Sequence, residues 1–163
     1  MHEAAYRYVL DQIAGNHYNR VVEVGGRDIN GSVRLLFTAD EYLSIDLEAG
    51  KNVDVVGDCR QWVPPYEADL VVCCEVLEHT PDPAGVVAAC IRYLAPGGLL
   101  VVTCAGPGRL PHSGHDGGAP RAGEWYANIS PGWLRRQLKA LDDAVVTFNP
   151  VACDTYATAT KPP

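Results

Sequence analysis

The chain has 163 residues, of which 47% are hydrophobic, and 20 acidic against 13 basic residues give a net charge of −7. This length suffices for one domain that buries most of its apolar surface, and it is too short for two ordinary domains. No run of Lys or Arg is long enough to follow a phosphate backbone, so we expect no nucleic-acid partner. The acidic charge fits a neutral or cationic ligand better.

The first residues, MHEAAYRYVLDQ, are interrupted by charges, and no stretch approaches the roughly 18 apolar residues of a membrane span. We therefore expect a soluble, cytoplasmic protein with no membrane partner. Most of the six cysteines lie in apolar runs, and none forms a C-x-x-C pair. This pattern predicts reduced thiols that act as small core residues, rather than disulfide bridges or metal sites.

Helix and strand signals alternate along the chain. Apolar residues at helical spacing predict a first helix over residues 3–14, which Gly15 stops. Ser32 is the expected N-cap of a helix that follows a glycine-containing turn. Asp82 is the expected N-cap of a helix over residues 83–94. Short runs rich in β-branched residues predict buried parallel strands at residues 21–24, 42–45, 53–56, 70–74 and 99–103.

A long stretch without an element of its own, residues 105–129, follows the fifth predicted strand. Loops of this length are usually functional lids or disordered segments, and the His, Asp and aromatic residues here favour a lid. Ser130 then predicts the start of a helix that runs as far as Leu141 and packs its leucines on the sheet. Residues 144–148 and 155–160 are expected to close the sheet as an antiparallel hairpin.

The first predicted strand leads into Gly25 and Gly26, which let the backbone turn tightly and approach a ligand. A dinucleotide fingerprint, G-x-G-x-x-G, would need glycine at Arg27 and Asn30, so an NAD enzyme is a distant alternative. Glu23 precedes the turn inside an apolar strand, where a carboxylate is costly unless it is paired or near a cationic ligand. The turn therefore predicts a nucleotide-like ligand other than a dinucleotide.

Acidic side chains end two further predicted strands, at the edge where open α/β sheets bind ligands. Asp46 can accept two hydrogen bonds from a ribose diol, or alternatively it only caps a turn. Asp58 can accept from an exocyclic amine such as that of adenine, with the Cys59 N–H on a ring nitrogen. Alternatively, Asp58 only caps the turn that follows it.

Together these motifs resemble the class I S-adenosylmethionine-dependent methyltransferases, in particular small-molecule members of the methyltransferase type 11 kind. The resemblance is carried by Glu23 and Gly25 of an E-x-G-x-G motif, by EVLEH at residues 75–79 and by LAPGG at residues 94–98. Arg27 departs from the pattern because it takes the place of the second glycine. The resemblance implies an α/β fold, namely a Rossmann-like three-layer sandwich with a seven-stranded, mostly parallel sheet and a C-terminal antiparallel hairpin.

The resemblance also implies how the chain is divided and where a cofactor binds. Residues 1–163 would form one minimal methyltransferase domain, with an N-terminal helix (1–16), a cofactor-binding half (20–104), a lid loop (105–129) and a closing helix and hairpin (130–163). The cofactor would be S-adenosyl-L-methionine, with Asp46 on its ribose hydroxyls and Asp58 and Cys59 on its adenine. The implied cofactor-binding residues are Glu23, Gly25, Gly26, Asp46, Leu47, Asp58, Cys59, Cys74 and Glu75.

Methyl transfer from a sulfonium is an in-line displacement, so the enzyme mainly holds the nucleophile and the methyl group in line. A base is needed only to remove a proton from an oxygen or nitrogen nucleophile. The candidate catalytic residues are His112, His115 and Asp116 of an H-x-x-H-D motif, because a carboxylate beside an imidazole can orient it. The alternatives are a surface loop without a role and a zinc or iron site, and the lack of a third conventional ligand nearby favours no metal.

Three further residues are candidates for contact with the substrate: His79, Trp125 and Tyr126. His79 alternatively braces the loop after the fourth strand, and the two aromatic residues alternatively fasten the lid to the body. The sequence thus predicts a methyltransferase that acts on an oxygen or nitrogen nucleophile of a small molecule. The alternative is a non-catalytic S-adenosylmethionine-binding or scaffold module. The short lid is compatible both with an open substrate pocket and with one that a second subunit of a homodimer completes.

Overall fold

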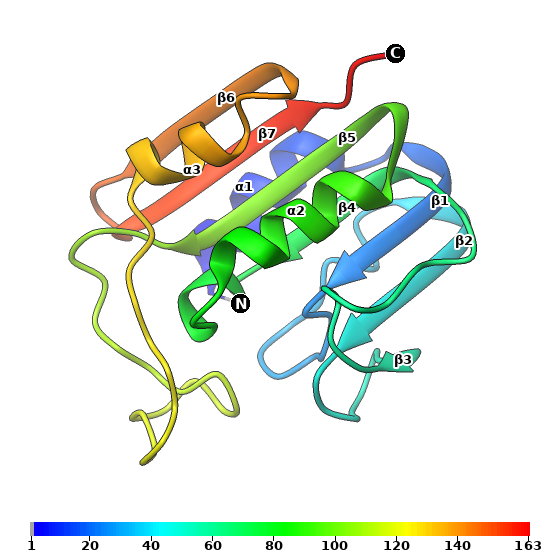
Figure 1. The fold of residues 1–163 in the computed structure, drawn as a ribbon. Coiled ribbons are helices and arrows are strands. Elements are labelled where there is room, and N and C mark those ends of the chain that lie inside the picture. The colour runs from blue at the N-terminus through cyan, green and yellow to red at the C-terminus, as the bar shows by residue number, and fades with distance from the viewer. Residues whose placement is uncertain (1) are drawn as a thin grey trace.

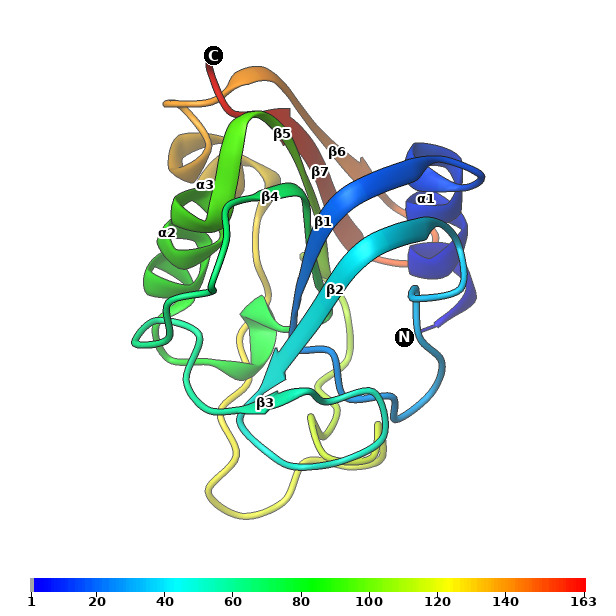
Figure 2. The ribbon, with the colours of Figure 1, turned by 90° about the vertical axis from the view of Figure 1, so that its right-hand side faces the viewer.

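The computed structural model describes residues 2–163, which form a three-layer α/β sandwich around a seven-stranded sheet (Figures 1 and 2). The strand order is β3-β2-β1-β4-β5-β7-β6, and β7 runs antiparallel to both of its neighbours, whereas the other pairs are parallel. The strands are β1 (His17–Val24), β2 (Thr38–Asp46), β3 (Val55–Val56), β4 (Ala68–Cys74), β5 (Leu94–Ala105), β6 (Asp142–Asn149) and β7 (Asp154–Thr160). The predicted fold class is confirmed.

Two hydrophobic cores, one on each face of the sheet, hold the layers together. Successive residues of a strand point to opposite faces, so the neighbours Val71 and Val72 of β4 belong to different cores. Helices α2 (Pro83–Tyr93) and α3 (Pro131–Gln137) cover one face, and α1 (Glu3–Ile13) covers the other (Figure 2). All six cysteines lie among the described residues and are free, as predicted, and four of them are buried.

Two of the helices begin where the sequence places their capping residues. Asp82 accepts a hydrogen bond from the Gly85 N–H at 3.0 Å, and Ser130 accepts one from the Trp133 N–H at 3.2 Å. Each cap is followed by a proline in the first turn, where the missing N–H costs nothing. Within residues 2–163, no helix combines the length and the apolar character that crossing a bilayer requires.

Two predicted helices differ from the structure. Every residue between β1 and β2 is described and none is helical, so the helix predicted from Ser32 is wrong. The Ser32 hydroxyl instead accepts from the Arg34 N–H at 3.1 Å, a local bond that competes with a helix. Helix α3 ends at Gln137 rather than Leu141, because the chain turns at Leu138 to enter β6. Both of these leucines are still buried.

Leu100 of β5 is fully buried, whereas Leu35 in the β1–β2 connection is 92% exposed. Leu100→Ala should therefore lower the free energy of unfolding by about 2–5 kcal/mol, because it removes buried methyl groups and leaves a cavity. Leu35→Ala should change that free energy by less than about 0.5 kcal/mol. Urea denaturation followed by circular dichroism measures both variants, and equal effects would contradict the assigned core.

Candidate functional site

A pocket of about 1190 Å³ lies at the carboxyl ends of β1, β2 and β4. Parallel strands bring these ends to one edge of the sheet, where α/β folds bind ligands. The segment between β5 and α3, residues 106–130, forms another wall of the pocket and is named the lid; it extends beyond the strand ends in Figure 1. All nine residues predicted to contact a cofactor line the pocket, as do His79, His112, His115 and Trp125, whereas Asp116 and Tyr126 lie outside its lining.

The turn after β1 fits only because two of its residues lack a side chain. A Cβ atom on Gly25 would lie 2.1 Å from Val76 Cγ2, and the φ of Gly25, +74°, is one that other residues rarely adopt. A Cβ atom on Gly26 would lie 2.6 Å from Ser44 Oγ. The Gly25 N–H donates to the Ile45 carbonyl at 2.8 Å, which holds the turn against β2.

Asp46, at the end of β2, ties the turn after β1 to the turn after β2. Its Oδ2 accepts a hydrogen bond from the Arg27 backbone N–H at 3.2 Å, and its Oδ1 accepts one from the Glu48 N–H at 3.0 Å. Asp46 therefore caps a turn, and each oxygen keeps a further lone pair for a ligand. Leu47, the next residue, is 71% exposed at the rim of the pocket.

Asp58 is engaged by an arginine that the sequence analysis did not identify. Arg60 donates to it through two nitrogens, with Nη2 2.6 Å from Oδ2 and Nε 2.9 Å from Oδ1, and also reaches Asp82 at 3.0 Å. Hydrogen bonds from Arg60 hold the pKa of Asp58 below its ordinary value. The carbonyl of the buried Cys59 accepts from the Tyr93 hydroxyl. The oxygens expected to face an adenine amine thus already have a partner.

Glu23 is a buried acid of the pocket, with 5% of its surface exposed. It accepts hydrogen bonds from the Tyr42 hydroxyl and from Asn52 Nδ2, the latter at 3.1 Å. Burial raises the pKa of Glu23 to about 8, although the hydrogen bond from Asn52 opposes the shift. The side chain is therefore mostly protonated at pH 7 in the ligand-free chain.

Glu75, at the tip of β4, has a left-handed backbone with φ +56°, which is uncommon for a residue other than glycine. Thr103 donates to its Oε1 at 3.0 Å, and His2 Nε2 lies 3.6 Å from its Oε2. His2 also lies 2.8 Å from Asp154, to which Arg109 donates at 2.9 Å. One ligand atom each from His2, Glu75 and Asp154 lie within 4.8 Å of one another, a spacing that could hold a metal ion. No sequence motif reveals this cluster, because its members come from distant segments.

The three lid residues predicted to act together have different partners. His115 lies between two glutamates, with Nδ1 2.9 Å from Glu48 Oε1 and Nε2 3.6 Å from Glu124 Oε1. The Asp116 carboxylate pairs with Arg121 at 2.5 Å. In the structure Asp116 therefore pairs with Arg121 and does not orient an imidazole, and His115 lies beside two glutamates instead.

His112 packs against His79 and Tyr126. The three rings meet edge to face, with centroids 4.9 Å (His79–His112), 5.5 Å (His79–Tyr126) and 5.1 Å (His112–Tyr126) apart. His112 Nδ1 lies 3.2 Å from the Leu110 carbonyl. In the tautomer that carries its hydrogen on Nδ1, this nitrogen donates to the carbonyl and Nε2 is the acceptor. Burial lowers the pKa of His79 to about 4, which keeps that ring neutral at pH 7.

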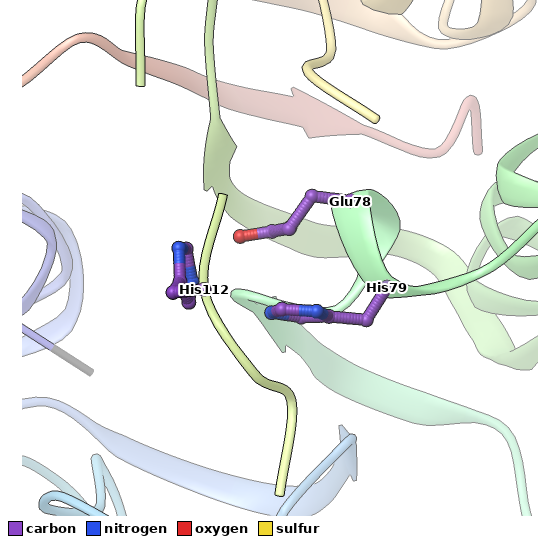
Figure 3. A group of neighbouring side chains, drawn as sticks. All are labelled: Glu78, His79 and His112. Carbon is purple, nitrogen blue, oxygen red and sulfur yellow. The ribbon is translucent and has the colours of Figure 1, made fainter. Parts of the chain in front are cut away.

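Glu78 of the 3-10 helix η1 (Leu77–His79) is fully buried, and Figure 3 shows its carboxyl group pointing toward the two imidazoles. Its Oε1 accepts from the Ala105 N–H at 3.0 Å and its carbonyl from the Ala127 N–H at 2.9 Å. Its Oε2 has no hydrogen-bond partner among residues 2–163. Ligand atoms of Glu78, His79 and His112 lie within 4.8 Å of one another, which could hold a metal ion. The sequence prediction of no metal assumed no further ligand near the H-x-x-H-D motif, and the fold places Glu78 and His79 beside one of its histidines, His112.

Comparison with known proteins places this architecture in a family. A family model described as a methyltransferase domain matches residues 6–147. A ubiquinone biosynthesis O-methyltransferase of Thiobacillus denitrificans is 52% identical over 56 residues, which are 32% of this chain and 24% of that protein. The protein of the same name from Cupriavidus pinatubonensis is 31% identical over 113 residues, 58% of this chain and 44% of that protein. The matches thus span less than half of these curated relatives.

Solved structures share the fold over almost the whole chain. The N-methyltransferase NodS from Bradyrhizobium japonicum WM9, in complex with S-adenosyl-L-homocysteine, is 18% identical with a TM-score of 0.64, covering 98% of this chain and 85% of that one. DhpI, also in complex with S-adenosyl-L-homocysteine, is 23% identical with a TM-score of 0.68, covering 98% and 84%. At these identities the likeness concerns the fold.

Glu23 should make stability depend on pH. Its folded-state pKa of about 8 lies above the ordinary 4.5, so the folded chain binds the proton more tightly, and stability is lost as pH rises from about 4.5 to 8. Glu23→Gln keeps the shape without the charge. The free energy of unfolding of this variant, relative to wild type, should therefore rise by on the order of a few kcal/mol between pH 5 and pH 8.

Urea denaturation at pH 5, 6.5 and 8 measures this difference. Glu41→Gln on β2 is the matched control, since the Glu41 side chain is 52% exposed. Its difference from wild type should stay nearly constant with pH. A constant difference for Glu23→Gln as well would contradict the raised pKa.

Proposed function

The chain belongs to the methyltransferase-domain family, and on that basis we propose that it transfers the methyl group of S-adenosyl-L-methionine to a small molecule. The observation that carries the proposal is the pocket at the ends of β1, β2 and β4, which is lined by all nine predicted cofactor residues. The nucleophile would be an oxygen or nitrogen, and the name O-methyltransferase of the curated relatives favours oxygen. In this proposal the chain is one minimal methyltransferase domain.

The pocket has the chemistry that a cationic cofactor with a ribose requires. Its volume of about 1190 Å³ lies above the roughly 300–1,000 Å³ of most small-molecule sites, which leaves room for an acceptor beside the cofactor. Asp46 would hold the ribose hydroxyls, and a positive ligand near Glu23 and Glu75 would favour their charged forms. When bound, the cofactor supplies a methyl group on a positively charged sulfur, and the lid would keep water from the pocket.

We propose His112 as the group that takes the proton of the acceptor. His115 and Asp116 are held by charged partners, whereas His112 lines the pocket, and its Nε2 is the acceptor in the tautomer that carries the hydrogen on Nδ1. His79 and Trp125 would contact the acceptor, since both line the pocket. Tyr126 would orient the His112 ring from outside the pocket, because the two rings pack edge to face with centroids 5.1 Å apart.

Asp46→Asn should weaken the binding of S-adenosyl-L-methionine and S-adenosyl-L-homocysteine by about 10- to 100-fold, because a charged acceptor of hydrogen bonds is lost. Isothermal titration calorimetry measures both affinities. The control is Asp40→Asn on the same strand, where the side chain is 64% exposed and pairs with His17 outside the pocket, and its affinities should equal those of wild type. Wild-type protein that binds neither compound would contradict the proposed function.

His112→Ala should lower the rate of methyl transfer by about 10²- to 10⁴-fold, the usual contribution of a general base, with the affinity for S-adenosyl-L-homocysteine unchanged. A panel of phenols, carboxylic acids and amines with radiolabelled methyl donor measures transfer. His17→Ala, at the far end of β1, is the control and should keep full activity.

Loss of S-adenosyl-L-homocysteine binding in His112→Ala would contradict the assignment of a base. Binding of the methyl donor by wild type without transfer to any acceptor of the panel would favour the non-catalytic binding module. Equal transfer rates of wild type and His112→Ala would remove His112 from the mechanism.

A further inference from the structure

Arg27 stands where the related methyltransferase motif has a second glycine, and its side chain reaches the lid. The guanidinium pairs with Glu48 through Nη1, and its Nη2 approaches the carbonyls of Gly114 and His115 at 3.4 and 3.5 Å. The side chain is only 17% exposed, and its aliphatic part packs where Gly50 leaves room, since a Cβ on Gly50 would lie 2.8 Å from Arg27 Cγ and Cδ. Arg27 is thus held in place between the turn after β1 and the lid.

Polar contacts continue from Glu48 into the lid through His115 and Glu124. Glu48 accepts from Arg27 with one oxygen and lies 2.9 Å from His115 Nδ1 with the other. His115 Nε2 lies 3.6 Å from Glu124, whose Oε1 accepts from the Ser113 hydroxyl at 2.8 Å. Arg27, Glu48, His115 and Glu124 are named the latch. The latch connects the rim of the sheet to both arms of the lid.

Two glycines of the lid also pack closely against the walls of the pocket. The lid residue Gly117 lies against Asn30 of the turn after β1, because a Cβ on Gly117 would lie 2.8 Å from Asn30 Nδ2. On the other side, a Cβ on Gly114 would lie 3.1 Å from His79 Cγ. The lid therefore lies in close contact with two walls of the pocket, at Asn30 and at His79. The Arg27 N–H also donates to Asp46, so one residue contacts both the lid and the proposed ribose site.

We propose that Arg27 is a positioning residue that, through the latch, holds the lid closed across the pocket and sets how fast the cofactor and its product are exchanged. The role in exchange depends on the proposed cofactor binding, whereas the closure itself does not. Removing the guanidinium should open the lid and speed release of the product. Lysine in its place would keep the charge for Glu48 but would lose the planar fork that also reaches the lid carbonyls.

Hydrogen exchange of the ligand-free chain tests the closure. In Arg27→Met, the peptides that cover residues 111–126 should exchange roughly tenfold faster or more, the factor that corresponds to losing a hydrogen bond to a charged group. Arg27→Lys should lie between Arg27→Met and wild type. Arg20→Met is the matched control, since Arg20 lies on β1, the strand that leads into the Arg27 turn, and makes an exposed ion pair with Glu41 at 3.2 Å. Peptides from β4 and β5 should be unchanged in every variant, which separates lid opening from unfolding.

Stopped-flow displacement of S-adenosyl-L-homocysteine tests the role in exchange, with a dissociation rate roughly tenfold higher expected for Arg27→Met and no change for Arg20→Met. Equal hydrogen-exchange rates of the lid peptides in Arg27→Met, Arg27→Lys and wild type would overturn the proposal that the latch holds the lid closed. Faster hydrogen exchange of the lid peptides together with an unchanged dissociation rate would overturn the proposed control of product release. Absence of S-adenosyl-L-homocysteine binding in wild type would overturn the proposed function and the control of release, while hydrogen exchange still decides the closure. If Arg27→Met does not fold, the comparison of Arg27→Lys with wild type decides both the closure of the lid and the control of product release.

Discussion

The close approach of Val76 to Gly25 is the constraint on which the pocket depends. The turn after β1 is enclosed by its neighbours on both sides, with Val76 from the end of β4 on one side and Ser44 of β2 against Gly26 on the other. Any side chain on these two glycines would push the three strand ends apart. The shape of the binding edge is therefore fixed by steric contacts at the strand ends, and it does not depend on the acidic groups.

The acids of the pocket divide into a buried group and a rim group. Glu23 and Glu78 are buried and Glu75 is partly buried, and desolvation is the main cause that raises the pKa of each of them. Asp46 and Asp58 lie nearer the rim, where backbone N–H groups or an arginine satisfy their charges. Burial therefore disfavours the charged forms of the inner acids, and a cation bound close to them would favour those forms.

Local signals allowed most of the fold to be predicted, and the errors come from loop conformation and from tertiary contacts. The caps Asp82 and Ser130 and the apolar strands act within a few residues, so the sequence suffices to place them. Ser32 failed as a helix start because its hydroxyl bonds within its own turn. The grouping of the lid motif failed because Glu48 and Arg121 decide where His115 and Asp116 point, and loop geometry cannot be derived from spacing. Glu78 reaches the lid histidine His112 only through tertiary packing.

Glu78 contacts the chain just before the lid, at Ala105, and again near the end of the lid, at Ala127. Its side chain accepts from the Ala105 N–H and its backbone carbonyl from the Ala127 N–H, so the segment between these two residues leaves and returns at a single buried point. The entropy of closing such a loop grows only slowly with its length. The lid can therefore be lengthened or rewritten between its two anchors at little cost to the sheet. Changes confined to that segment could therefore alter which methyl acceptors a protein of this architecture takes, while the strand ends that line the proposed cofactor site stay unchanged.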